Sequence, residues 1–144
     1  MIAQAALTSP MWLNAWGKLP IISPLPASTS SASRPTSLIA ATAQRLTDER
    51  GLVYRYLGQD GLPGQEGTFL ACTFWLAQAQ ALAGDAAAAV ATFERAVAAI
   101  NDVGLLAEEV DPRSGEMIGN FPQAFSHIGL VNAAWAITQA QQSR

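Results

Sequence analysis

The chain lacks the sequence features that define disulfide-rich, zinc-binding, nucleic-acid-binding or membrane-spanning proteins. Its single cysteine, Cys72, excludes an internal disulfide and a thiolate-rich zinc site. The eight Lys and Arg are scattered among eleven Asp and Glu, so no basic stripe is present to neutralise phosphates. No apolar run approaches the roughly 20 residues that a helix needs to cross a bilayer. We therefore expect neither nucleic acid nor a membrane as a partner.

Signals for export and for bound ions are also missing. The N-terminal residues lack a positively charged start and a sustained apolar core, since Pro10 and Pro20 interrupt them, so we expect a cytoplasmic protein. The Asp, Glu and His residues show neither calcium-loop nor zinc-helix spacing, and we predict no metal site and no cofactor. Cys72 lies in an apolar stretch, where burial as an unreactive thiol is expected.

Apolar residues, in contrast, are abundant. Half of the 144 residues are apolar and only 13% are charged, a balance typical of a packed helical protein rather than a disordered chain. Residues 1–34 contain several prolines followed by a run of Ser, Thr and Ala, and we expect them to form an irregular segment. From Pro35 onward helical patterns dominate, so residues 35–144 are predicted to form one helical unit. The predicted fold class is all-α.

Four helices are predicted, each from an apolar face and from residues that favour a helix start or end. They cover residues 35–50, 68–83, 85–100 and 121–139. Thr68 and Asp85 are the predicted N-caps of the second and third helices. Residues 52–57 form a short β-like run that is too isolated to predict a sheet, and residues 58–67 are a glycine-rich loop.

Carboxylates are concentrated in the segment 101–119, which joins the third and fourth predicted helices. They are Asp102, Glu108, Glu109, Asp111 and Glu116. A solvated surface loop would also carry such a cluster, but Leu105, Leu106 and Val110 are apolar and should anchor the adjacent Glu pair against the core. Because successive side chains of an extended segment alternate, one carboxylate of the pair can face a cleft while the other faces protein or solvent.

The same segment resembles part of a known family. Residues 107–111 follow a pattern of a small residue, Glu, a second Glu, an apolar residue and Asp. This pattern is similar to the catalytic-base segment of glucoamylase-type glycoside hydrolases, glycoside hydrolase family fifteen. The similarity continues through further stretches, namely Leu46–Tyr56, Asp60–Phe69, Cys72–Trp75, Gly115–Glu116 and Phe125–His127. It covers most of the chain and favours the bacterial glucoamylase and trehalase branch.

The resemblance implies both a fold and a reaction. It implies that the chain supplies four to five helices of an (α/α)6 barrel, a six-hairpin toroid of twelve helices, and that the enzyme cleaves α-glucosidic bonds with inversion. By this resemblance Glu108 is the general base that activates water, and Glu109 occupies a position where Gln is common. The family's general acid lies in an earlier segment containing Trp and Glu, whereas Trp12 and Trp16 have no Glu beside them. The implied chain is therefore the C-terminal part of the catalytic domain, with the base but not the acid, and we expect this chain alone to be inactive on trehalose and maltose.

Three other residues are candidate substrate contacts, each with a structural alternative. Glu66 precedes a predicted helix and either binds sugar hydroxyls or acts as a structural anion near the helix dipole. Arg55 either contacts substrate through its fork of donors or pairs with a carboxylate. Phe121 either packs with its helix or stacks on a sugar ring. His127 has no triad partner nearby in the sequence and is expected to pack or cap rather than to catalyse.

Two functional hypotheses remain open from the sequence. In the first, the chain is part of an inverting hydrolase that acts on trehalose, maltooligosaccharides or a similar α-glucoside. In the second, it is a non-catalytic helical remnant or interaction module that retains the family's pattern. An incomplete barrel leaves apolar helix faces uncovered, so self-association through these faces is expected.

Overall fold

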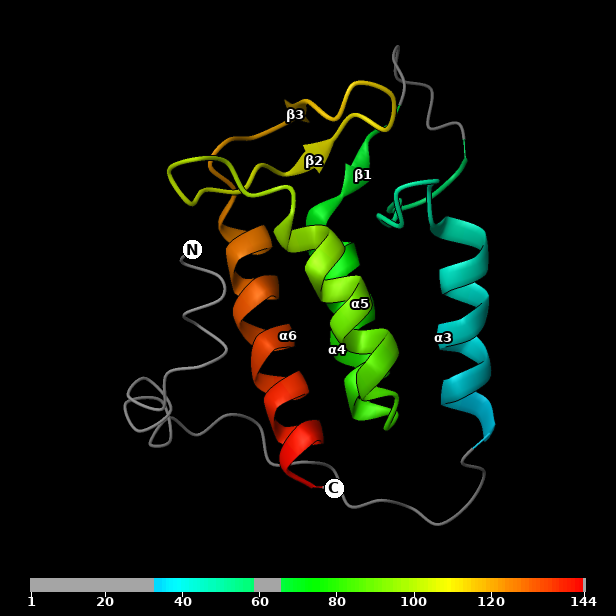
Figure 1. The fold of residues 1–144 in the computed structure, drawn as a ribbon. Helices are drawn as coiled ribbons and strands as arrows, with labels where there is room; N and C mark the ends of the chain where they lie inside the picture. Colours follow the sequence, from blue (N-terminus) through cyan, green and yellow to red (C-terminus); the bar gives the residue numbers. More distant parts are fainter. Residues whose placement is uncertain (1–32, 59–65, 144) are drawn as a thin grey trace.

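The computed structural model of the chain describes residues 33–58 and 66–143, in which four helices and three short strands are present (Figure 1). In chain order these are α3 (Ser33–Leu46), β1 (Thr68–Phe69), α4 (Leu70–Leu82), α5 (Ala86–Val97), β2 (Glu109–Val110), β3 (Met117–Ile118) and α6 (Ala124–Gln142). The predicted irregular segment 1–34 lies outside the described residues, except that its last two residues begin α3. Helices make up most of the described residues, which confirms the predicted helical class.

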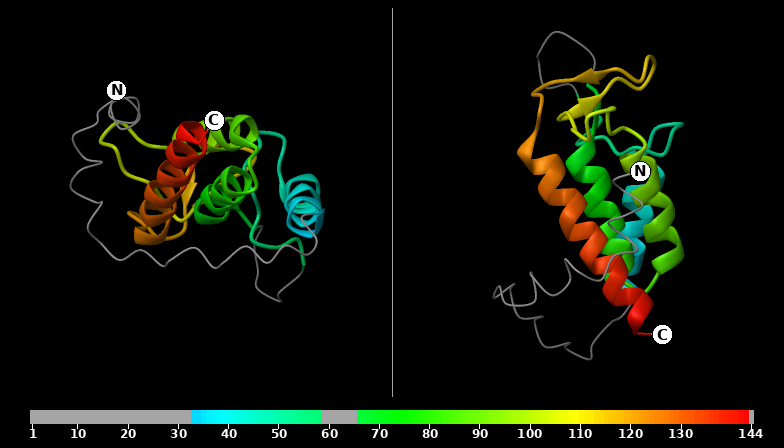
Figure 2. Two further views of the ribbon diagram at one scale, coloured as in Figure 1. Left: turned by 90° about the horizontal axis from the view of Figure 1, so that it is seen from below. Right: turned by 60° about the vertical axis from the view of Figure 1, so that its left-hand side comes forward.

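The central helix of the fold is α4. It lies between α6 and α3 and also packs against α5, which in turn contacts α6 (Figure 2). The strands gather at one end of the helices, close to the start of α4 and of α6 (Figure 1). None of the helices in the described residues is long and apolar enough to cross a membrane.

Large apolar side chains of α4, α5 and α6 form the core. Leu70 and Phe74 of α4 are fully buried, and the Phe74 ring meets the Phe93 ring of α5 edge to face, with 5.7 Å between their centroids. Gly129 of α6 lies against α4, where a Cβ atom would come within 3.1 Å of the Phe74 Cβ. Burial of these rings holds the three helices together, since burying one Phe side chain contributes about 1.5–3 kcal/mol.

A small antiparallel sheet, in the order β1–β2–β3, closes one end of the helices. Its register pairs are Thr68–Val110, Phe69–Glu109, Glu109–Ile118 and Val110–Met117. The predicted β-like run 52–57 meets this sheet through an isolated bridge between Tyr54 and Thr68. The sheet itself was not predicted, because each strand has only two residues and the partners lie far apart in the chain.

Thr68 is a strand residue, and its prediction as the N-cap of a helix is wrong. Its side chain is fully buried, and its hydroxyl donates a hydrogen bond to the Val110 carbonyl oxygen at 3.0 Å. The helix α4 therefore begins two residues later, with Phe69 at the N-cap position in an extended conformation and without a side-chain cap. The hydroxyl that would cap a helix binds a strand that lies 42 residues further along the chain.

The remaining helix boundaries follow the prediction to within a few residues. Asp85 caps α5 as predicted, since its carboxylate accepts a hydrogen bond from the backbone N–H of the third helical residue. The helix α3 ends before Thr47, because Thr47 pairs with Val53 in an isolated bridge. The helix α6 begins three residues later than predicted, at Ala124, with Gln123 at its N-cap.

Candidate functional site

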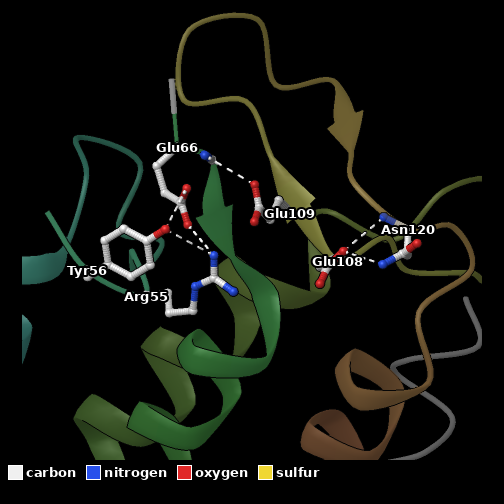
Figure 3. Close-up of polar contacts among 7 residues, drawn as sticks. Arg55, Tyr56, Glu66, Glu108, Glu109 and Asn120 are labelled. Atoms are coloured by element: carbon white, nitrogen blue, oxygen red, sulfur yellow. Dashed lines mark hydrogen bonds and ion pairs between the residues drawn. The ribbon is translucent and has the colours of Figure 1, made fainter. Parts of the chain in front are cut away.

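The sheet brings charged side chains from three parts of the chain to one end of the helices (Figure 3). Glu108 immediately precedes β2, and Glu109 is the first residue of that strand. Glu66 lies two residues before β1. Arg55 comes from the segment that follows α3 and reaches Glu66 across a gap of 11 residues in the sequence.

Among the described residues, Asn120 alone forms hydrogen bonds with the carboxylate of Glu108. Its Oε2 atom accepts hydrogen bonds from the backbone N–H of Asn120 at 3.0 Å and from the side-chain Nδ2 at 2.8 Å. The backbone N–H of Glu108 in turn donates to the Asn120 carbonyl oxygen at 2.9 Å. Glu108 is half-buried, and among the described residues it forms no ion pair. A half-buried carboxylate without a cationic partner is available for proton transfer.

The carboxylate of Glu109 has a different environment. Its Oε2 accepts a hydrogen bond from the backbone N–H of Gly67 at 3.2 Å, on the side away from Asn120 (Figure 3). Burial raises the pKa of Glu109, and the charges of Glu66 and Glu108 raise it further, while the Gly67 hydrogen bond and Arg55 oppose the increase. The two adjacent Glu side chains thus have separate partners, as expected for consecutive residues of an extended segment.

Arg55 and Glu66 form an ion pair, with 2.9 Å between the Arg55 Nη2 and Glu66 Oε1 atoms. The Tyr56 hydroxyl donates to the other Glu66 oxygen at 3.4 Å, and the Arg55 guanidinium lies over the Tyr56 and Phe69 rings. The structure therefore shows the carboxylate pairing that was considered for Arg55, with Glu66 as its partner. The helix-dipole alternative for Glu66 stays a prediction. The contact of both residues with a sugar also stays a prediction. Because the Arg55 side chain is 47% exposed, this pair contributes little to stability.

Known proteins with similar sequences assign the chain to a family. A sequence model of the glycosyl hydrolases family 15 matches residues 34–135, most of the chain. The chain belongs to glycosyl hydrolase family 15. This match confirms the resemblance found from the sequence, and it includes all four predicted site residues: Arg55, Glu66, Glu108 and Phe121.

Curated relatives within this similarity carry the name trehalase. The trehalase of Mycobacterium tuberculosis is 42% identical over 112 residues, which cover 76% of this chain and 16% of the relative. The trehalase of Thermoplasma acidophilum is 36% identical over 127 residues, covering 85% of this chain and 21% of the relative. The chain therefore spans about a sixth to a fifth of the length of these relatives. No solved structure matches the chain.

The family 15 match agrees with the helical part of the fold prediction. Four helices are present in the described residues, within the predicted four to five of a twelve-helix toroid. The closed ring of that toroid remains a prediction.

Phe121 directly follows Asn120 in the sequence, at the junction between β3 and α6. It is 49% exposed, so it is not part of the buried core of this family 15 chain. The exposed ring leaves the second alternative considered for it, stacking on a sugar, open as a prediction.

Two residues of α6 anchor the backbone that leads to Glu108. The Ser126 hydroxyl is buried and donates to the Ala107 carbonyl oxygen at 2.7 Å. His127 accepts the Leu106 N–H at its Nε2 atom, and its Nδ1 atom lies 2.7 Å from the Gln123 carbonyl oxygen. His127 thus has the packing and capping role that was predicted for it. The role of Asn120 and Ser126 was missed, because the sequence marks them only as the start and the interior of a helix.

Two open cavities flank the charged cluster, and Glu108 lines neither of them. One has a volume of about 840 Å³ and includes Tyr56 and Glu66 in its lining. The other, of about 300 Å³, lies between α3 and α4 and includes Cys72. Cys72 is half-buried rather than fully buried as predicted, and burial raises the pKa of its thiol. Within the described ranges, no group of three or more His, Cys, Asp and Glu is placed to hold a metal ion.

Proposed function

We propose that this chain supplies the general base of an inverting glycoside hydrolase that cleaves α-glucosidic bonds, and that Glu108 is that base. Trehalose is the first substrate to consider, because the curated relatives are named trehalases. The observation that carries the proposal is the state of the Glu108 carboxylate. It is half-buried, has no cationic partner in the described part of the chain, and has one oxygen bound by Asn120.

The chemistry assigned to Glu108 is proton removal from water. In an inverting glycosidase, one carboxylic acid protonates the leaving oxygen while a carboxylate on the opposite face of the sugar activates the attacking water. The two groups lie about 6.5–9.5 Å apart, which leaves room for that water. Glu109 follows Glu108 directly and faces a different side, so it is not the acid across the ring. The proposal assigns the general acid to no residue of this chain.

Arg55, Glu66 and Phe121 are proposed as substrate contacts around this base. Arg55 and Glu66 each keep donor or acceptor capacity for sugar hydroxyls, because their side chains are 47% and 28% exposed. The Phe121 ring is exposed next to Asn120 and is suited to stacking on the apolar face of a sugar. The ligand class is an α-glucoside or a short oligosaccharide.

A substrate that needs no general acid tests the base directly. Fluoride leaves α-glucosyl fluoride without protonation, so a chain with only the general base should release fluoride from it while leaving trehalose and maltose intact. We expect this release to be lost in Glu108→Gln, which cannot accept the proton. Glu116→Gln is the matched control, because Glu116 is an exposed carboxylate of the same β2–β3 segment. Fluoride release that survives Glu108→Gln, or is absent from the unmodified chain, would contradict the proposal.

A non-catalytic interaction module is the second candidate function, and the surface of α6 favours it. The residues Phe125, Ile128 and Val131 are exposed along this helix. The sequence of α6 contains no Asp, Glu, Lys or Arg, so no charge opposes contact between two such surfaces. We expect the chain to self-associate through this face. Sedimentation of the double variant Phe125→Gln, Ile128→Gln should show a smaller species than the unmodified chain, and unchanged sedimentation would exclude this face.

A cytoplasmic location of the protein also remains a prediction.

A further inference from the structure

We infer that Asn120 is the positioning residue of Glu108, and that it directs Glu108 to accept the proton of water on Oε1 rather than on Oε2. The second part of this inference rests on the proposed function, since it presumes that Glu108 is the general base. The first part, that Asn120 fixes the carboxylate, stands on the geometry alone.

Three hydrogen bonds join these two residues, which lie 12 positions apart in the chain. Two of them end on the same carboxylate oxygen, Oε2, at 3.0 Å and 2.8 Å. The third runs in the other direction, from the Glu108 N–H to the Asn120 carbonyl oxygen at 2.9 Å. The hydrogen bonds formed by backbone N–H groups fix the distance between the two segments. The Asn120 side chain fixes the orientation of the Glu108 carboxylate plane.

The two oxygens of Glu108 are therefore chemically different. A carboxylate oxygen offers about two lone-pair sites, and both sites of Oε2 are directed at N–H groups of Asn120. No hydrogen bond to Oε1 is present in the described part of the chain, and this oxygen points away from Asn120 (Figure 3). A proton accepted by Oε1 leaves both bonds to Oε2 intact, whereas a proton on Oε2 would displace one of them. Oε1 is accordingly the oxygen that takes the proton.

The Glu108 carboxylate lies close against the neighbouring backbone. Gly119 has a φ of +74°, and a Cβ atom there would lie 2.9 Å from the Glu108 Oε2. The carboxylate thus rests directly over a residue that has no side chain. Ser126 and His127 hold the preceding residues in place through the backbone of Ala107 and Leu106. The backbone before Glu108 is thus anchored, and the Asn120 side chain restrains the Glu108 side chain itself.

The variant Asn120→Ala separates positioning from a general structural role. It removes only the Nδ2 donor, because the backbone N–H of residue 120 still binds Oε2. We expect fluoride release from α-glucosyl fluoride to fall between about tenfold and 100-fold, mainly in kcat, since small misplacements of a catalytic group have effects of that size. Asn120→Asp, which has a similar shape but places an acceptor against Oε2, should be at least as impaired.

A spectroscopic measurement makes the test independent of turnover. Scalar couplings of the Glu108 side chain should report one rotamer in the unmodified chain and averaging among rotamers in Asn120→Ala. The matched control is Asn101→Ala, since the Asn101 side chain likewise binds backbone groups, accepting the N–H of Val103 and of Leu105, but in the described residues forms no hydrogen bond with Glu108. We expect this control to leave both the Glu108 couplings and fluoride release unchanged.

The possible outcomes distinguish this inference from the proposed function. Unchanged Glu108 couplings in Asn120→Ala would overturn the positioning role, whatever the activity. Averaged couplings with unchanged kcat would overturn the link between positioning and proton transfer. If Glu108→Gln retains fluoride release while Asn120→Ala shows averaged couplings, the proposed function fails and the positioning role stands.

Discussion

Adding one methyl group beneath the Glu108 carboxylate should disturb it, and a second glycine of the chain provides the reference for that effect. Gly119 and Gly84 both have a positive φ, of +74° and +88°. An Ala in this region of backbone conformation costs about 1–2 kcal/mol. Reduced freedom of the unfolded chain offsets about 0.4–1 kcal/mol of that cost. Around Gly84 no atom lies within 4 Å of the added Cβ, so Gly84→Ala should show this backbone effect alone.

Gly119→Ala carries the same backbone cost and a steric one. Its Cβ would lie 2.9 Å from the Glu108 Oε2 and 3.1 Å from the Glu108 Cβ, so the side chain must leave its place beside Asn120. The displaced carboxylate gives up its two hydrogen bonds from Asn120, each worth about 0.5–1.5 kcal/mol. We expect Gly84→Ala to lower the free energy of unfolding by roughly 1 kcal/mol and Gly119→Ala by roughly 2–4 kcal/mol.

Urea unfolding followed by circular dichroism measures both variants, and fluoride release from α-glucosyl fluoride is the second measurement. Only Gly119→Ala should lose fluoride release, because only there is Glu108 displaced. Equal losses of stability in the two variants, with fluoride release intact, would mean that the Glu108 carboxylate does not rest over Gly119. Glu108 would then not occupy the position from which it is proposed to act as the base.

Two further predictions concern stability. Glu109→Gln keeps an oxygen that accepts the Gly67 N–H. It removes a carboxyl group whose pKa is raised by burial and by the charge of Glu66. A raised pKa means that the folded state holds its proton more tightly than the unfolded state, so stability falls as pH rises above the ordinary value of 4.5. The variant should therefore melt at a higher temperature than the unmodified chain at neutral pH and at the same temperature in acid, and a gain that persists in acid would refute this cause. Phe74→Ala should lower the free energy of unfolding by about 3–5 kcal/mol, since Phe74 is fully buried; a loss below about 1 kcal/mol in urea unfolding would show that the Phe74–Phe93 contact is not the centre of the core.

The helices could be predicted from the sequence where local patterns decide the structure. Asp85 caps α5 as its position before an apolar run indicates, and Phe93 within the predicted third helix is buried. The prediction failed at Thr68, where pairing with Val110 outweighs the local preference of a hydroxyl residue for a helix start. Such pairing joins residues far apart in the chain, so no local window contains it.

The candidate site could likewise be predicted only in part. Glu108 was identified as the candidate base because its segment resembles the family pattern, and the alternation of the Glu108 and Glu109 side chains follows from their being adjacent. From the sequence, Asn120 is only the residue before the fourth predicted helix, although its side chain and backbone bind Glu108. That contact depends on the antiparallel register of β2 and β3, which the sequence does not indicate. A sequence motif can thus indicate a reacting group without indicating the residue that orients it.

The register of the small sheet also explains why the two adjacent Glu residues are not equivalent. Glu109 rests against Gly67 and Glu108 against Gly119, so each carboxylate occupies space that a side chain would fill. A shift of one residue in the pairing of β2 would exchange their sides. Glu109 needs only an acceptor for the Gly67 N–H, which a neutral Gln supplies equally well. Glu108 has two N–H donors on one oxygen and, in the part of the chain that the structure describes, none on the other, and the proposed acceptance of a proton there requires a carboxylate.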